Sequence, residues 1–189
     1  MARQLDSIVV IDVESTCWRN GPPAGQESEI IEIGIAVLEV HSHEISGRDA
    51  ILVKPERSRV SDFCVELTSL TQEVLDREGI AFADACTKLA ETYSTRTRTW
   101  ASYGSYDRKM FERQCLERAV KYPFGATHLC LKNLFALTQR LRREVGMSTA
   151  LRRAGLELQG RHHRGVDDAY NAAKLLAWLL SGNPRPGDC

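Results

Sequence analysis

The 189-residue chain has no apolar run near the roughly 20 residues that a membrane-spanning helix requires. It has no net charge either, because 25 Lys and Arg balance 25 Asp and Glu. Its start lacks the basic, apolar and small segments of a secretory signal, since acidic Asp6 and Asp12 bracket the apolar stretch. A hydrophobic content of 43% excludes a disordered, collagen-like or coiled-coil chain. Together these features predict a cytoplasmic globular protein that does not associate with a membrane.

Cysteine chemistry has little support in the sequence. None of the six cysteines is spaced as C-x-x-C, so the usual zinc and redox motifs are absent. The chain is neither short nor secreted in character, which argues against a disulfide scaffold. His41 and His43 could bind a metal ion together, but no third ligand lies near them, and we expect a polar hairpin tip there.

The length is that of one compact domain, which we expect to span residues 1–189, with a core at about 7–181 and a tail at 182–189. Charge divides unevenly along this domain. Residues 1–95 carry 8 basic and 17 acidic side chains, a net charge of −9, whereas residues 96–189 carry 17 and 8, a net charge of +9. This asymmetry indicates either a polyanionic partner for the basic half or charge segregation without a function.

Five short segments have the apolar patterns of strands. Residues 7–13 are β-branched and apolar on both faces, which is typical of a central buried strand. Residues 30–40 show apolar side chains at every second position, as a half-buried strand does. The remaining expected strands cover residues 45–53, 97–101 and 127–131. The first three strands follow one another closely, which predicts an antiparallel meander.

Helical patterns occupy most of the rest of the chain. Ser61 or Asp62, and then Thr71, are expected to cap two short helices. Further helices are predicted over residues 84–93, 106–120, 134–145, 147–154 and 167–180. This order of elements indicates an α/β fold with a five-stranded mixed sheet flanked by helices. Ligand sites in such folds lie at the carboxyl ends of the strands.

The first predicted strand ends in two acidic residues, Asp12 and Glu14. Residues two apart on a strand point to the same side, so the two carboxylates converge. Buried like charges are costly unless a cation neutralises them. Taken alone, however, such a pair more often marks a strand that emerges into a polar loop.

Two more acids stand where helices begin. Asp107 follows the predicted strand 97–101 and opens a helix, where an N-cap is the simpler explanation. Asp168 shares the apolar face of Leu175 and Leu179 in the last helix, so its carboxylate points toward the core and needs a partner. Asp167 lies on a more polar face, where an acid in the first turn suits the helix dipole.

The four acids Asp12, Glu14, Asp107 and Asp168 offer only hard oxygen ligands, which suit Mg²⁺ or Mn²⁺ rather than zinc. Two such ions about 3.5–4 Å apart are the usual apparatus for phosphodiester cleavage. A histidine near the acids could take the proton of the attacking water, because the pKa of His lies near neutrality. The chain places two histidines, at 162 and 163, just before the last helix.

Three stretches resemble the motifs of the DEDDh 3′–5′ exonucleases: IDVESTCW from Ile11, the segment around Asp107, and HRGVDDAYNAA from His163. The chain is most similar to the branch linked to histone mRNA and RNA interference and to its KapD-like bacterial relatives. The marks of that branch are D-x-E-x-T-C at 12–17, F-C-x-x-L-T-x-x-T-Q at 63–72 and G-R-x-H-x-G-x-D-D-x-x-N at 160–171. Each motif is short, but their order and spacing across roughly residues 7–180 make the resemblance specific.

This resemblance implies a ribonuclease-H-like fold and a two-metal mechanism. The ligands of two divalent ions, Mg²⁺ or Mn²⁺, would be Asp12, Glu14, Asp107 and Asp168, with Asp12 bridging. Glu14 and His163 would act in catalysis, His163 as the general base. His162 precedes Asp167 by five residues, just as His163 precedes Asp168, so either pair could match the motif. The Gly165 pattern and the apolar face of the helix select His163 with Asp168.

The implied reaction is hydrolysis at a nucleic-acid 3′ end, with release of 5′-mononucleotides and a preference for RNA over DNA. Ser15 and Thr16 would contact the terminal nucleotide, and Leu67 would either wedge against the last base or belong to the core. Arg161 and Arg164 are candidate phosphate ligands. Further basic residues are candidates for phosphate contacts too, with a solvated helix face as an equally good explanation: Arg140, Arg142, Arg143, Arg152 and Arg153.

Two other functions stay open. A DNA-directed or short-oligomer exonuclease of the same family would carry the same motifs, because contacts to the 2′-OH separate RNA from DNA. A catalytically weak RNA-binding module is expected to have lost an acid or the histidine, and all five motif residues are present.

Overall fold

The computed structural model describes residues 4–182. Within this range the elements follow in the order β1 (Gln4–Ser15), β2 (Ile30–Glu39), β3 (Ile45–Leu52), α1 (Asp62–Thr68), α2 (Gln72–Glu78), α3 (Phe82–Thr92), β4 (Arg98–Ser102), α4 (Tyr106–Glu117), β5 (His128–Cys130), α5 (Leu131–Thr138), α6 (Met147–Arg153) and α7 (Gly165–Leu180). The predicted tail at 182–189 lies, apart from residue 182, outside the described residues.

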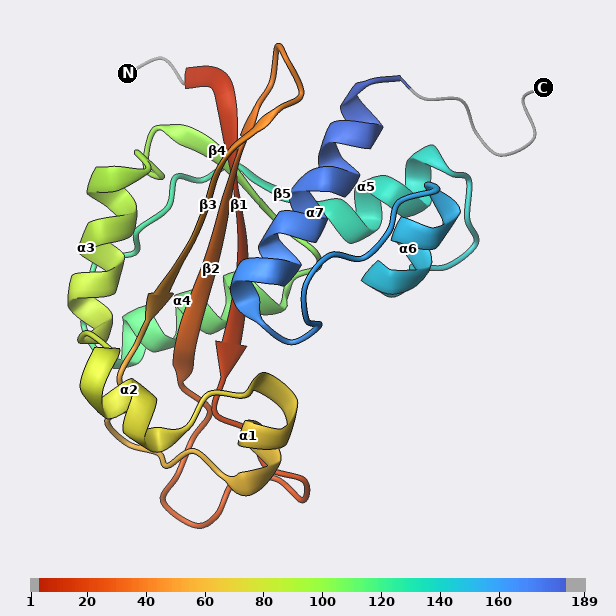
Figure 1. The fold of residues 1–189 in the computed structure, drawn as a ribbon. Coiled ribbons are helices and arrows are strands. Elements are labelled where there is room, and N and C mark those ends of the chain that lie inside the picture. The colour runs from red at the N-terminus through yellow and green to blue at the C-terminus, as the bar shows by residue number, and fades with distance from the viewer. Residues whose placement is uncertain (1–3, 183–189) are drawn as a thin grey trace.

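The strands form one mixed sheet in the order β3-β2-β1-β4-β5 (Figure 1). β1, β2 and β3 pair antiparallel, whereas β4 is parallel to β1 and β5 is parallel to β4. The predicted meander, the five strands and the α/β class are therefore confirmed. Because β1 is the central strand and β4 runs parallel to it, the carboxyl ends of both strands lie at one end of the sheet.

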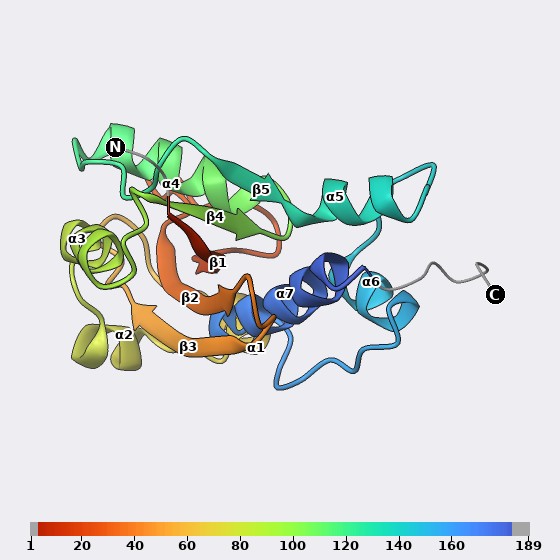
Figure 2. The ribbon, with the colours of Figure 1, turned by 90° about the horizontal axis from the view of Figure 1, so that it is seen from above.

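Helices cover both faces of this sheet (Figure 2). Val9, Ile11 and Val13 of β1 pack into a core with α3 and α4. Ile8 and Val10 pack into a second core with α5, α6 and α7. Successive side chains of a strand point to opposite faces, so burial on both faces explains why residues 8–11 are apolar without interruption.

The predicted helix over residues 134–145 has the wrong bounds. α5 starts at Leu131 and ends at Thr138, so residues 134–138 are helical and residues 139–145 are not. Arg140 adopts a left-handed φ of 52°, and the Leu141 N–H donates to the carbonyl of Ala136, five residues back. This pattern, with Leu141 packed against the core, is a Schellman motif that ends a helix. The three arginines at 140, 142 and 143 therefore stand on a loop rather than on a helix face.

Smaller features agree with the sequence or shift by a few residues. Ser61 and Thr71 cap α1 and α2 through their side-chain oxygens, as predicted. The residues around His41 form the turn between β2 and β3. α7 begins at Gly165, two residues before the predicted start. Among residues 4–182, no helix combines the length and the apolar composition that a bilayer crossing requires.

Candidate active site

β1 delivers two carboxylates to one face of the sheet. Ile8 and Val10 point toward α7, and the alternation of the strand continues this face to Asp12 and Glu14. Glu14 is buried, with 8% of its surface exposed, whereas the side chain of Asp12 keeps some exposed surface. The apolar strand thus ends in two acids on the side that α7 covers.

A pair of glycines brings α7 to these acids. Gly34 lies opposite Asp12 in the β1–β2 register, and a Cβ on Gly34 would lie 1.9 Å from the carbonyl carbon of Gly165. A Cβ on Gly165 would in turn lie 3.0 Å from the nitrogen of Gly34 and 3.1 Å from the Asp12 carbonyl oxygen. Only residues without a side chain allow such an approach. The first turn of α7, which carries Asp168, therefore rests directly on the backbone of β1 and β2.

Asp107 reaches the same place from the other neighbour of β1. It lies in the first turn of α4, shortly after β4 ends, and its Oδ1 accepts a hydrogen bond of 2.9 Å from the Val13 N–H. β1 pairs with β4 only as far as Val10, so on this side of the strand the Val13 N–H is bonded to Asp107 and not to β4. The N-cap explanation for Asp107 is wrong, because Ser105 holds the cap position.

The structure thus brings all four predicted acids together. Ligand oxygens of Asp12, Glu14 and Asp168 all lie within 4.8 Å of one another. The same pocket, with a volume of about 310 Å³, is lined by these three acids and by Asp107. The cluster combines oxygen ligands from β1, α4 and α7, and it contains no thiol.

Burial and mutual repulsion raise the pKa of three carboxyl groups in this cluster. Burial is the largest cause for three of the acids, and neighbouring carboxylates add to it. The pKa of Asp12 is raised well above its ordinary range by burial and then by Asp107, Asp168 and Glu14. The pKa of Glu14 is raised to about 8 by burial and Asp168, and burial raises that of Asp107 to about 6. Such a set of oxygens fits divalent cations, because a cation among the carboxylates would offset their mutual repulsion.

Two histidine rings border Asp168. His162 Nδ1 lies 3.0 Å from both carboxylate oxygens of Asp168, and the backbone N–H of His163 donates to Oδ2 over 2.8 Å. The two rings stack with centroids 4.0 Å apart, and both line the pocket. Burial, followed by the neighbouring His162, lowers the pKa of His163. The contact between the His162 ring and Asp168 was not predicted, and the choice of His163 as the base stays a prediction.

Glu32 is a fifth acid that sequence reasoning missed. It is fully buried, and its carboxylate accepts hydrogen bonds from the Gly165 N–H at 2.8 Å and from Arg164 Nη2 at 3.1 Å. It also lies opposite Glu14 in the β1–β2 register. Glu32 therefore fixes the start of α7 beside the cluster. An acid inside an otherwise apolar strand was the signal that could have pointed to it.

The remaining predicted residues take varied positions. Ser15 Oγ bonds to the Tyr106 hydroxyl at 2.7 Å, and the buried Thr16 hydroxyl accepts from the Glu29 N–H at 2.9 Å. Ser15 and Thr16 do not line the pocket. Leu67 is partly exposed on α1, and it does not line the pocket.

The two predicted phosphate ligands are engaged within the protein. Arg161 donates to the Glu66 carbonyl oxygen on α1, and Arg164 forms the ion pair with Glu32. The side chain of Arg164 remains 31% exposed, so part of the guanidinium is open to solvent.

The other wall of the pocket comes from residues that the motifs did not indicate. They are Tyr103, Tyr106, Lys132, Gly146 and Met147. Tyr106 directly precedes Asp107 and is 52% exposed, which is unusual for a large aromatic side chain. The segment from α5 to α6 thus closes the pocket opposite the acids.

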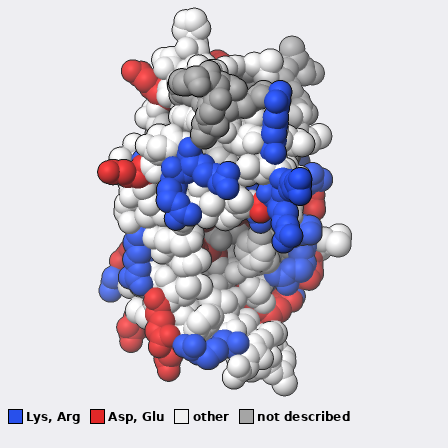
Figure 3. Space-filling view, turned by 90° about the vertical axis from the view of Figure 1, so that its right-hand side faces the viewer, with Lys and Arg blue, Asp and Glu red and all other residues white. Residues whose placement is uncertain are grey.

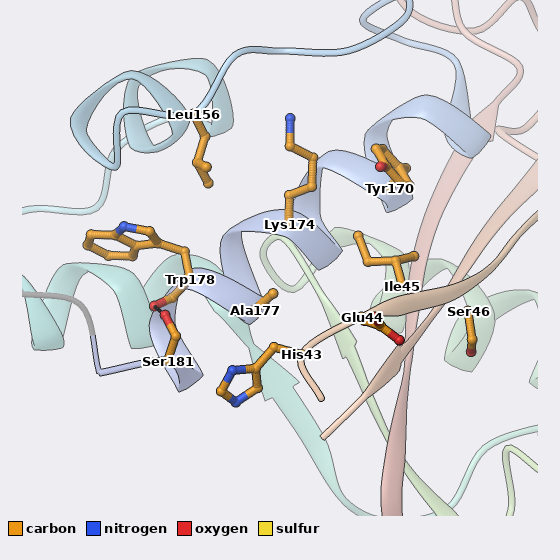
Figure 4. A pocket seen from close by; sticks show the side chains of 10 residues that line it. All are labelled: His43, Glu44, Ile45, Ser46, Leu156, Tyr170, Lys174, Ala177, Trp178 and Ser181. Atoms are coloured by element: carbon orange, nitrogen blue, oxygen red, sulfur yellow. Dashed lines mark hydrogen bonds between the residues drawn. The ribbon is translucent and has the colours of Figure 1, made fainter. Parts of the chain in front are cut away.

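A larger cavity of about 630 Å³ lies elsewhere, between α7 and the turn that joins β2 to β3. Figure 4 shows the lining side chains, which include Trp178, Lys174 and Tyr170 of α7 together with His43 and Ile45. This turn is at the amino end of β1, because Val40 donates its N–H to the Asp6 carbonyl. The cavity is therefore at the opposite end of the sheet from the acids, and we assign the chemistry to the smaller pocket.

Comparisons with known proteins agree with this geometry. A family model described as Exonuclease matches residues 9–176. The chain is 32% identical to 3′-5′ exoribonuclease 1 of Rattus norvegicus over 93% of its own length and 53% of that protein, and 30% identical to the Homo sapiens protein of the same name over 93% and 52%. The chain thus spans about half the length of these curated relatives.

Solved structures show the same architecture. The nuclease domain of 3′hExo, described as a DEDDh family member bound to rAMP, superposes with a TM-score of 0.85 at 28% identity and covers 98% of this chain and 100% of that one. A structure described as 3′-end specific recognition of histone mRNA stem-loop by 3′-exonuclease gives a TM-score of 0.84 at 29% identity, with 96% and 66% covered.

Proposed function

The chain belongs to the exonuclease family that the matching model describes, and from this premise we propose that it removes nucleotides one at a time from the 3′ end of RNA. The resemblance indicated by the motifs is thereby confirmed, as is the ribonuclease-H-like fold that it implied. The observation that carries the proposal is the convergence of four carboxylates from three separate elements in one pocket. The preference for RNA is supported by the similar proteins, which are named exoribonucleases.

Exonucleases of this family generally depend on divalent metal ions. We propose that two ions, Mg²⁺ or Mn²⁺, are held by Asp12, Glu14, Asp107 and Asp168, whose buried oxygens carry the repulsion that a cation removes. When bound, such ions activate a water molecule and neutralise charge on the leaving oxygen.

The side chains of this protein supply positioning and proton transfer. His163 lines the pocket next to Asp168, and its ring nitrogen would accept a proton from the attacking water. The oxygen of this water forms a bond to phosphorus, and the bond from phosphorus to the 3′ oxygen of the preceding nucleotide breaks. That oxygen then takes a proton, and a 5′-mononucleotide leaves. Glu32 and Gly34 hold the start of α7, so that Asp168 and His163 meet β1.

The terminal nucleotide would enter between the acids and the opposite wall. Tyr106 offers an exposed ring at the pocket, on which a base of any identity can stack. The hydroxyl groups of Ser15 and Thr16 already have partners within the protein, and both residues stay predictions as contacts of the terminal nucleotide. Leu67, Arg161 and Arg164 stay predictions as substrate contacts.

A digestion experiment tests the proposal. Single-stranded RNA and DNA of the same sequence, labelled at either end, would be incubated with Mn²⁺, Mg²⁺ or EDTA. We expect a metal-dependent ladder that shortens from the 3′ end, faster on RNA, and lost in Asp12→Asn. Asp84→Asn is the matched control, because Asp84 is exposed on α3, away from the pocket. Shortening of DNA alone would reject the RNA assignment, and no shortening under any condition would reject the activity.

A further inference from the structure

Five arginines on one stretch of the chain have no side-chain partner among the described residues, 4–182. They are Arg140, Arg142, Arg143, Arg152 and Arg153, and all are exposed. Within residues 4–182 none of the five side chains takes part in an ion pair or a hydrogen bond, whereas outside this stretch the same holds only for Arg59 and Arg96. The concentration of unpaired cations in one stretch is a feature that the fold itself does not explain.

Acidic neighbours do not balance this stretch. Glu144 is the single acid among residues 131–156, and it pairs with Lys132 at 3.4 Å. Because Lys132 takes the one local carboxylate, the positive charge of the arginines is left without a counter-charge on its own segment. An uncompensated basic patch attracts polyanions from solution.

The arginines lie on the same segment as one wall of the reaction pocket. Lys132, Gly146 and Met147 line the pocket, and α6 begins at Met147. At 1.5 Å per residue, Arg152 and Arg153 lie about 8–9 Å along this helix from the pocket wall. Arg142 and Arg143 precede Gly146 by four and three residues, which limits their backbone separation from the wall to about 14 Å.

Contacts with the core hold this segment in place. The Tyr103 hydroxyl donates to the Val145 carbonyl oxygen at 2.8 Å, and Leu141 and Val145 pack against the core beside α7. The loop is therefore anchored by its apolar residues while its arginines face solvent. Figure 3 looks at the α5–α6 side of the molecule and shows Lys and Arg gathered around a hollow with acidic atoms inside it.

We propose that these five arginines bind the phosphates of the RNA strand that leads away from the 3′ end held in the pocket. The inference rests on the proposed function, because a strand whose last nucleotide lies among the acids must cross the pocket rim. The acid cluster alone would repel a polyanion, and the arginines supply the opposite charge next to it. They would give affinity without reading sequence, since phosphates are the same in every nucleotide.

Salt dependence of binding tests the proposal without any turnover. A 5′-labelled single-stranded 20-nucleotide RNA would be titrated by fluorescence anisotropy in EDTA, between 50 and 300 mM KCl. Five phosphate contacts on a single strand predict a slope of log K against log salt of about −3.5, at roughly −0.7 per contact. Arg152→Gln with Arg153→Gln should reduce this slope by about 1.4, and the fivefold Gln variant should remove most of it.

Arg59→Gln with Arg96→Gln is the matched control, since both side chains are exposed and unpaired but lie outside this stretch. The control should bind with the wild-type slope. An equal loss of slope in the control and in the α6 variant would overturn the proposal. The proposal would also be overturned by a fivefold variant that keeps the wild-type salt slope for RNA binding but no longer binds phosphatidylserine vesicles. In that case the arginines would serve a lipid surface and not RNA.

Substrate length provides the second readout. With Mn²⁺ present, the fivefold variant should show a raised KM for the 20-nucleotide RNA, an unchanged KM for a trinucleotide and an unchanged kcat for both. An equal rise of KM for both lengths would contradict a role outside the pocket. The two proposals can fail separately. If the wild type binds RNA with the arginine-dependent salt slope but cleaves nothing, the proposed function fails and the binding surface stands. If the wild type cleaves RNA but the arginine variants keep its salt slope, only the binding surface fails.

Discussion

Replacing Glu14 by Gln should stabilise the metal-free protein while weakening its response to metal ions. Glu14 has a pKa near 4.5 in an unfolded chain and about 8 in the fold, mainly because of burial and then because of Asp168. Between these two pH values the folded protein holds a proton that the unfolded chain has released. The free energy of unfolding therefore falls as the pH rises through this window, and the loss is complete above about pH 8.

The expected size follows from the same two pKa values. At 1.36 kcal/mol per pH unit, the raised pKa of Glu14 lowers the free energy of unfolding by about 3 kcal/mol at pH 7 and by about 5 kcal/mol above pH 8. The uncharged Gln side chain avoids this ionisation cost but still loses some hydration. We therefore expect Glu14→Gln to gain about 1–3 kcal/mol at pH 7, or about 2–10 °C in Tm for a chain of this length.

Urea unfolding followed by circular dichroism, in EDTA at pH 5, 6, 7 and 8, measures this gain. The difference between variant and wild type should be smallest at pH 5 and should grow as the pH rises. Glu91→Gln is a suitable control, because Glu91 is exposed near the end of α3 and is expected to change stability by less than about 0.5 kcal/mol. A Glu14→Gln protein that is less stable than wild type at pH 8, or a difference that does not vary with pH, would refute the reasoning.

Three further substitutions probe the site. Asp12→Ala should abolish hydrolysis and the rise in Tm that Mn²⁺ produces, and a full Mn²⁺ shift in this variant would exclude Asp12 as a ligand. His163→Ala should lower kcat about 100-fold or more while the Mn²⁺ shift persists, and a larger loss in His162→Ala would transfer the role of base to that residue. Gly34→Ala should cost about 2 kcal/mol or more in urea unfolding, because its Cβ would meet the backbone of α7 at 1.9 Å. In the control Gly47→Ala the nearest neighbour of the new Cβ is the Val37 side chain, at 3.3 Å, and an equal cost in both variants would contradict the close-packing explanation.

The sequence predicted the architecture because the strands have distinct apolar patterns. Residues 7–13 could be assigned to a buried central strand, since both of its faces pack against helices. The end of α5 could not be predicted in this way. Helices often end at a glycine in the left-handed conformation, but here Arg140 adopts that conformation. The sequence therefore has no glycine to mark the end of the helix.

Three of the four acids were found because they stand beside apolar residues: Asp12 and Glu14 end an apolar strand, and Asp168 lies on the apolar face of the last predicted helix. Asp107 opens the more polar helix α4, and it was singled out because it follows a predicted strand and matches the family motif. Glu32 was not found, because its role depends on Arg164 and Gly165, which are more than 130 residues away in sequence. The closeness of Gly34 to Gly165 is equally a property of the packed chain. The extent of the single domain over residues 1–189 and the cytoplasmic location both stay predictions.

The site joins β1 to α7, the first and last elements of residues 4–182, and this has a consequence for biosynthesis. Asp12 is made early, but Asp168 joins it only after the ribosome has added the residues of α7. Until then the growing chain has two carboxylates on β1 but neither Asp168 nor the two histidines that precede α7 beside them. On the proposed function, a nascent chain can therefore fold much of its sheet next to messenger RNA without a complete centre for cutting it, and that centre is complete only when α7 docks.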